Sequence, residues 1–160
     1  MSMAGAKSTP VLHAEALTLE YRDATRTVRA VDGVTLTVEP GEFVGLVGPS
    51  GSGKSSLLFL LAGLRRPQAG RVEVLGEALP SEPDRGAPIR RRRIGFLFQE
   101  PFLVPYLSVR ENALVHAVDA ASAERVEALA SEIGMAHLLP ERPHRLSGGE
   151  RQRAGILRAL

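Results

Sequence analysis

The chain has 160 residues, a length that favours one domain with a sizeable core. Apolar residues make up 44% of the sequence, as in soluble globular proteins; no stretch has the length of a membrane span, and residues 1–10 lack the apolar core of a signal peptide. There is no cysteine, which excludes disulfides and thiolate metal sites, and the net charge of +2 does not indicate nucleic-acid binding.

The first part of the chain predicts three antiparallel strands. We expect them over residues 11–20, 26–31 and 34–38, with a tight hairpin turn at Asp32-Gly33. Tyr21, where the first strand ends, has two interpretations: an ordinary strand tyrosine, or a platform on which a nucleotide base stacks. Its position alone favours the ordinary strand tyrosine.

Residues 48–55 match the G-x-x-x-x-G-K-S pattern of a phosphate-binding loop, the Walker A motif. An apolar run before the loop, at 42–47, predicts a buried strand, and the run 56–62 after it predicts a buried helix that ends at Gly63. Glycines let backbone N–H groups turn inward toward a triphosphate. The predicted phosphate-binding residues are Gly48, Pro49, Ser50, Gly51, Ser52, Gly53, Lys54, Ser55 and Ser56. We expect Lys54 to reach the β and γ phosphates and Ser55 to place its hydroxyl on Mg²⁺.

The region after the loop helix predicts a strand at 71–75, a loop rich in proline and glycine at 79–88, and a second buried strand at 94–98. The basic run at 90–93 most often indicates a solvated surface. Gln99 follows the second strand, where its amide could reach a nucleotide, because ligands bind beyond the carboxyl ends of such strands. An ordinary polar residue that ends a strand explains it equally well.

A proline-broken loop with apolar side chains follows at residues 100–108. Its side chains include Phe102 and Tyr106. They indicate either a docking surface or a loop that packs into its own core.

The last third of the chain predicts helices that begin at serines. We expect helices over residues 109–118, 123–133 and from 148 onward. Ser108 and Glu111 have the spacing of a capping box. Ser147 precedes two glycines, which leave the first N–H groups of the last helix open to an anion. The sequence therefore predicts a second anion site there.

The phosphate loop and the sequence Leu-Ser-Gly-Gly-Glu at 146–150 together resemble the nucleotide-binding subunits of ABC transporters. The resemblance covers residues 11–160 and is strongest to the subgroup that serves lipoprotein-release and macrolide-export permeases. It implies an α/β fold, with a P-loop NTPase core, an N-terminal antiparallel β-subdomain and an inserted helical subdomain. Residues 11–98 would form the β-subdomain and phosphate-loop core, and 99–160 the helical part, after a flexible N-terminus at 1–10.

The resemblance also implies residue roles and partners. Tyr21 matches the adenine-stacking aromatic, and Gln99 matches the Q-loop glutamine that meets Mg²⁺ and the attacking water. The signature that contacts the ATP of the opposite subunit corresponds to Leu146, Ser147, Gly148, Gly149 and Glu150. The implied cofactors are ATP and Mg²⁺. The implied partners are a second or paired ABC domain and an integral-membrane permease, with no nucleic acid, and the implied location is the cytoplasmic face of the cell membrane.

Members of this family continue past the signature helix with an apolar strand ending in Asp, then a catalytic Glu, and later a histidine. The 160 residues contain no Asp-Glu pair, so we expect a fragment whose core sheet lacks its C-terminal part. The leading expectation is an ATPase subunit that couples ATP hydrolysis to export or release. The alternatives are a nucleotide-binding remnant without hydrolysis and a non-transport ABC-type ATPase; a P-loop kinase would not explain residues 146–150.

Overall fold

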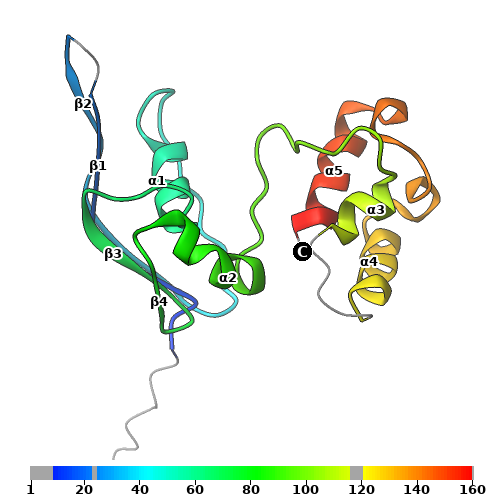
Figure 1. Cartoon of the computed structure of the whole chain (residues 1–160), viewed down its shortest axis with the longest axis horizontal. Coiled ribbons are helices and arrows are strands. Elements are labelled where there is room, and N and C mark those ends of the chain that lie inside the picture. Colours follow the sequence, from blue (N-terminus) through cyan, green and yellow to red (C-terminus); the bar gives the residue numbers. More distant parts are fainter. Residues whose placement is uncertain (1–8, 23–24, 116–120, 160) are drawn as a thin grey trace, which may run out of the picture. The chain divides into compact units, whose positions relative to one another are not determined.

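The computed structural model describes residues 9–22, 25–115 and 121–159. The chain divides into two compact units, with the boundary between Arg93 and Ile94 (Figure 1). This boundary lies a few residues before the division at 98/99 that the sequence predicts. Apart from residues 9 and 10, the predicted flexible N-terminus lies outside the described residues.

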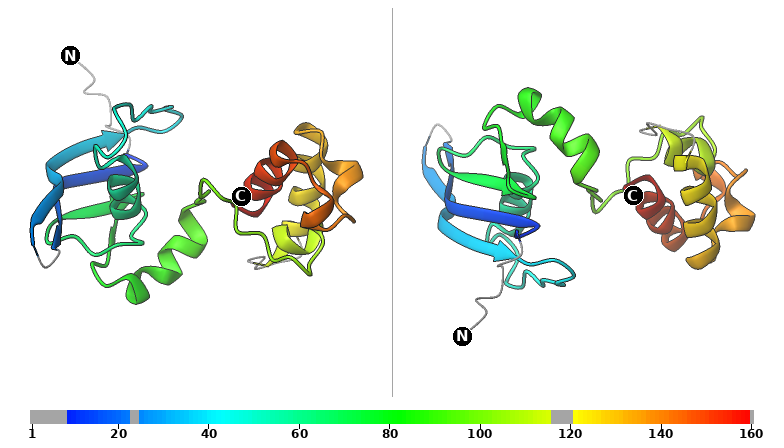
Figure 2. Two further views of the ribbon diagram at one scale, coloured as in Figure 1. Left: turned by 90° about the horizontal axis from the view of Figure 1, so that it is seen from above. Right: turned by 90° about the horizontal axis from the view of Figure 1, so that it is seen from below.

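The first unit is built on a four-stranded antiparallel sheet in the order β2-β1-β3-β4. The strands are β1 (Leu12–Arg22), β2 (Thr27–Val38), β3 (Ala69–Val74) and β4 (Glu77–Leu79). Helix α1 (Lys54–Leu61) packs on β1 and β2, against one face of the sheet (Figure 2). Apolar side chains of the sheet and of α1 form the core, among them Ala14, Leu17, Leu19, Val31, Leu57, Leu60, Val72 and Val74.

The predicted hairpin turn at Asp32-Gly33 is wrong, because both residues lie inside the continuous strand β2. The strand register jumps there: Leu17 pairs with Val34, and Leu19 pairs with Val31. Strand β2 therefore carries an extra residue, a β-bulge, and Gly33 adopts the left-handed conformation that a bulge needs (φ +59°). An Asp-Gly pair suits either a hairpin turn or a β-bulge, and only pairing with the neighbouring strand decides between them.

The two predicted buried strands at 42–47 and 94–98 are also wrong for the described residues, where both segments are irregular and neither is a strand of the sheet. Phe43 and Val47 are 97% and 90% exposed. An apolar run predicts burial, but a strand forms only where a neighbour satisfies its backbone N–H and C=O groups. Nothing in the local sequence specifies that neighbour.

The loop predicted at 79–88 is largely helical, because α2 spans Pro83–Arg93. Pro83 suits the first turn of α2, and the four arginines at its end complement the negative end of the helix dipole, although Pro88 lies inside the helix. Arg90 also donates to the carbonyl oxygens of Gly63 (3.0 Å) and Pro83 (2.6 Å). The contact with Gly63 attaches α2 to the end of α1, which the local sequence did not reveal.

The second unit is helical. Its elements are α3 (Val109–Leu114), α4 (Ala121–Glu132), the 3₁₀ turns η1 (Ala136–Leu138) and η2 (Pro143–Arg145), and α5 (Gly148–Ala159). Helix α5 packs against α3 and α4 (Figure 2). The core of the unit consists of Val109, Ala113, Val126, Ala130, Met135, Leu139, Leu146, Ala154 and Leu157. The three predicted helices are confirmed, although α3 is shorter than expected and residues 116–118 of that prediction lie outside the described residues.

Candidate functional site

The phosphate loop, residues 48–55, depends on three glycines with positive φ angles. The angles are +152° at Gly48, +81° at Gly51 and +85° at Gly53. Side chains at such positions are strained, which explains glycine there. Gly53 has a second constraint, because a Cβ atom on it would overlap the carbonyl oxygen of Ala30 in β2. The sheet thus sets where the loop ends and α1 begins.

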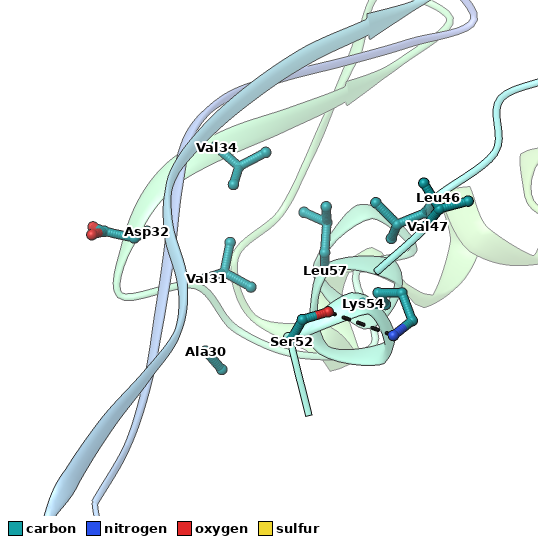
Figure 3. Close-up of a pocket in the computed structure, with 10 residues that line it drawn as sticks. Ala30, Val31, Asp32, Val34, Leu46, Val47, Ser52, Lys54 and Leu57 are labelled. Atoms are coloured by element: carbon teal, nitrogen blue, oxygen red, sulfur yellow. Dashed lines mark hydrogen bonds between the residues drawn. The ribbon is translucent and has the colours of Figure 1, made fainter. Parts of the chain in front are cut away.

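Lys54 places its ammonium group over the phosphate loop. Its Nζ atom donates to the carbonyl oxygens of Gly48 (2.9 Å) and Pro49 (2.6 Å). It also lies 3.5 Å from Ser52 Oγ, the contact that is dashed in Figure 3. A cation that neutral carbonyl groups hold in this position remains available to a phosphate, which would supply full negative charge.

The N-terminus of α1 carries no group that would compete with an anion. Gly53 is the N-cap and makes no side-chain capping bond, and no acidic residue lies in the first turn. The free N–H groups and the positive end of the helix dipole therefore point at the loop. The site fits a phosphate group.

A magnesium ion fits the same place only with the help of phosphate oxygens. Among the residues that the structure describes, no group of three His, Cys, Asp or Glu side chains could hold a metal ion. Ser55 is exposed in the first turn of α1 and offers one hydroxyl oxygen. This matches the habit of Mg²⁺, which takes few protein ligands and completes its shell with phosphate and water oxygens.

A cavity of about 320 Å³ lies between β2 and the phosphate loop (Figure 3). Its lining residues include Ala30, Val31, Val34, Leu46, Val47 and Leu57 on the apolar side, and Ser52, Gly53 and Lys54 at the polar end. The apolar walls do not suit a triphosphate. We therefore place the phosphate site at the loop and not inside this cavity.

Tyr21 lies at the end of β1 and contacts α1. Its hydroxyl is 3.1 Å from Ser56 Oγ, and the guanidinium carbon of Arg65 lies 5.1 Å from the centre of its ring. The hydrogen bond with Ser56 lowers the pKa of Tyr21, Arg65 acts in the same direction, and burial opposes both. Tyr21 as a whole residue is 37% exposed, so it is partly open to solvent.

The signature, residues 146–150, begins helix α5. Ser147 N and Oγ both donate to Glu150 Oε2 at 2.7 Å, and Glu150 N approaches Ser147 Oγ at 3.4 Å, which makes a capping box. These hydrogen bonds, first from the hydroxyl and then from the backbone of Ser147, lower the pKa of Glu150. Leu146 is buried and anchors the segment, whereas Ser147, Gly148 and Gly149 are exposed.

Gln99 is connected to the signature helix through its backbone. Gln152 of α5 donates from Nε2 to the Gln99 carbonyl oxygen. Helix α5 also contacts the residues that follow Gln99. Arg158 donates to the Phe102 carbonyl oxygen. Gly155 packs so closely on the loop that a Cβ atom on it would lie 2.6 Å from Pro101 Cβ. A displacement of the loop after Gln99 would therefore break or shift its contacts with α5.

Asn112 is a residue that the sequence reasoning missed. It is fully buried in α3, and its side chain bonds the loop before the helix. Oδ1 accepts from Val104 N (2.7 Å), and Nδ2 donates to the carbonyl oxygens of Val104 (3.1 Å), Leu107 (3.1 Å) and Ser108 (3.0 Å). A polar residue three positions after Val109, on the apolar stripe, is the signal that could have found it.

The structure thus brings the predicted site residues together in two groups. In the first unit, Tyr21 meets the phosphate-loop helix through Ser56. In the second unit, Gln99 meets the signature helix through Gln152. Arg65 and Gly155 complete these two groups, and sequence reasoning identified neither of them.

Comparison with known proteins agrees with this arrangement. Residues 31–160 match the protein family described as ABC transporter. The lipoprotein-releasing system ATP-binding protein LolD of Maricaulis maris is 44% identical over 156 residues, which is 94% of this chain and 68% of that protein. The macrolide export ATP-binding/permease protein MacB of Hyphomonas neptunium is 40% identical over 157 residues, 94% of this chain. The chain spans only 24% of the length of that MacB protein.

Solved structures agree as well. The dimeric structure of MJ0796, a bacterial ABC transporter cassette, superposes with a TM-score of 0.84 at 31% identity, over 93% of this chain and 68% of that one. A second dimeric structure of MJ0796, in a post-hydrolysis state bound to ADP and Pi, gives a TM-score of 0.78 at 32% identity, over the same shares of the two chains, 93% and 68%.

The chain therefore belongs to the ABC transporter family. The predicted family and the α/β fold class of an ABC ATPase are confirmed. The family binds ATP and drives transport with it, as the resemblance implied. None of the described helices is long and apolar enough to cross a bilayer.

Proposed function

We propose that this chain binds ATP with Mg²⁺ and couples ATP binding and hydrolysis to export or release of a substrate through an integral-membrane permease. One observation carries the proposal: an uncapped helix N-terminus, three glycines with positive φ and the Lys54 ammonium converge on one loop. This combination suits a triphosphate. The names of the relatives, a lipoprotein-releasing ATP-binding protein and a macrolide exporter, support transport as the process it drives.

The site residues keep the roles that the resemblance implied, now as proposals. Residues 48–56 would bind the phosphates, with Lys54 on the β and γ phosphates. Tyr21 would stack on adenine. Ser55 and Gln99 would hold Mg²⁺, and Gln99 would also orient the attacking water.

The second half of the site would come from another subunit. We propose that residues 146–150 contact the ATP held by the phosphate loop of a second copy or of a paired ABC domain. The exposure of Ser147, Gly148 and Gly149 supports this role, and the dimeric MJ0796 structures supply the precedent of a two-subunit cassette. Residues 11–98 would thus hold nucleotide, and 99–160 would reach the opposite subunit and the permease.

The apolar loop after Gln99 would meet the permease at the cytoplasmic face of the membrane. Phe102 and Tyr106 are 63% and 72% exposed, and they lie in one loop, which supports a contact with a partner there. Asn112 holds their loop in place with four hydrogen bonds.

Substitution of Lys54 tests nucleotide binding. Lys54→Ala should weaken binding of a fluorescent ATP analogue by about 100-fold, because charge-assisted bonds to phosphate are lost. Lys7→Ala is the matched control, since Lys7 and Lys54 are the two lysines of the chain. Equal affinities of Lys54→Ala and the wild type would refute the phosphate-loop assignment.

Substitution of Ser147 tests the signature. Ser147→Arg should preserve ATP binding but abolish ATP-dependent dimerisation, measured by analytical ultracentrifugation, and turnover. Ser108→Arg removes a similar capping box from α3 and is the matched control. Normal dimerisation of Ser147→Arg would exclude the signature role.

A further inference from the structure

The phenol ring of Tyr21 is held at two points that the family assignment does not explain. Its hydroxyl meets Ser56 Oγ at 3.1 Å, and Arg65, four residues beyond the end of α1, lies with its guanidinium over the ring at 5.1 Å from the centre. Both contacts come from the segment that continues out of the phosphate loop. The orientation of the ring is therefore tied to the position of that loop.

We propose that Arg65 is a positioning residue for nucleotide binding: it covers one face of the Tyr21 ring and so presents the other face to the base. This inference rests on the proposed adenine-stacking role of Tyr21. A guanidinium over an aromatic face is attracted by the ring quadrupole, so it holds the ring at a fixed tilt. A fixed ring should bind the base more tightly, because a ring that is already ordered loses less conformational freedom on binding.

The hydrogen bond to Ser56 supplies the second constraint. Ser56 lies in the first turn of α1, two residues after Lys54. The same helical turn would therefore hold the phosphates and fix the phenol that stacks on the base. Arg65 prevents the ring from tilting, and Ser56 prevents its tip from swinging away from α1.

The neighbouring Arg66 has another contact in the structure. Arg66 lies 3.9 Å from Glu82 Oε1, so its side chain has a different partner. Arg66→Gln removes the same charge one residue away and is the matched control for Arg65→Gln.

The test uses the tyrosine fluorescence of the chain, which has two tyrosines and no tryptophan. In a Tyr106→Phe background, Tyr21 is the only emitter, and ATP should quench it whereas inorganic triphosphate should not. Arg65→Gln should weaken ATP binding by about threefold to tenfold and leave the affinity for inorganic triphosphate, measured by calorimetry, unchanged. Arg65→Lys should recover part of the loss, and Arg66→Gln should behave as the background does.

A separate variant tests the Ser56 contact. Tyr21→Phe keeps the ring and removes the hydroxyl, so it should weaken binding of a fluorescent ATP analogue by about threefold and spare inorganic triphosphate. Thermal unfolding followed by circular dichroism confirms that each variant is folded.

Two results would overturn the inference. If ATP quenches Tyr21 but Arg65→Gln binds ATP as tightly as the background or more tightly, Arg65 does not position the ring, while the stacking role of Tyr21 stands. If ATP binds without quenching Tyr21, the stacking role itself fails, and the inference fails with it. A loss of affinity for inorganic triphosphate in Arg65→Gln would also contradict it, because the effect would then concern phosphate and not the base.

Discussion

The N-termini of α1 and α5 are the two helix ends to which sequence and family give phosphate roles, and they are built in opposite ways. Gly53 begins α1 without any side-chain cap or first-turn acid. Ser147 begins α5 with a capping box, and Glu150 brings a carboxylate into the first turn. The structural helix α3 has the same box, formed by Ser108 and Glu111. At its N-terminus, α5 therefore resembles a structural helix more than it resembles α1.

This difference predicts different roles for the two helix ends in binding one nucleotide phosphate. An uncapped helix end offers several free N–H groups and a positive dipole, which together attract an anion from water. A helix end whose Ser and Glu already bond each other offers fewer free donors to an anion, and its carboxylate repels negative charge. We therefore expect α1 to bind nucleotide by itself, and α5 to contact only a nucleotide that another loop already holds.

The largest expected effect is that of a side chain at the start of α1. Gly53→Ala combines left-handed strain with overlap of the β2 backbone, so it should lower the free energy of unfolding by about 3 kcal/mol. Gly51→Ala is the control, because its φ of +81° is similar but nothing lies within 4 Å of its Cβ position. Gly51→Ala should lower the free energy of unfolding by about 1 kcal/mol, from backbone strain alone. Urea unfolding measures both values, and equal losses would show that contact with Ala30 is unimportant.

Removal of the serine caps sharpens the comparison between α5 and α3. Ser147→Ala and Ser108→Ala should each lower the free energy of unfolding by about 1 kcal/mol, because each removes one capping hydroxyl. Only Ser147→Ala should also weaken ATP-dependent dimerisation. Chemical denaturation and sedimentation measurements on the two variants separate these effects; impaired dimerisation of both variants would mean that the loss reflects stability alone.

Low pH should weaken the capping boxes that begin α3 and α5, whereas the N-terminus of α1 has no such box to lose. The Ser108 backbone N–H and hydroxyl lower the pKa of Glu111 below its ordinary value of 4.5, and the Ser147 hydroxyl and backbone N–H do the same for Glu150. Because the folded pKa values are lowered, these carboxylates stabilise the fold above pH 4.5, and the contribution disappears as the pH falls through the folded values. Glu111→Gln and Glu150→Gln should each lower the free energy of unfolding at neutral pH and flatten its pH dependence below 4.5. A pH dependence identical to that of the wild type would contradict this account.

Sequence reasoning found the elements whose signal is local. The glycine-rich loop, the caps at Ser108 and Ser147 and the helix stops at Gly63 and Gly134 depend on the conformations that a few consecutive residues can adopt, and the structure shows each of them where expected. The cap predicted at Ser122 is wrong, because α4 begins at Ala121 and so includes Ser122. Glycine at a positive φ and serine three residues before glutamate have the same meaning in any fold. The family assignment rested on such local motifs and is confirmed.

Sequence reasoning failed where the answer depended on a neighbour far away in the chain. Whether Asp32-Gly33 makes a turn or a bulge depends on the register of β1, and whether 42–47 makes a strand depends on a pairing partner. The Arg65–Tyr21 contact and the four bonds of Asn112 are likewise invisible to spacing. The sequence by itself determined the glycine-rich loop and the family, because both are written in short motifs. Only the tertiary structure decided which side chains hold Tyr21 and the loop after Gln99 in place, because those contacts join segments that backbone preference alone does not bring together.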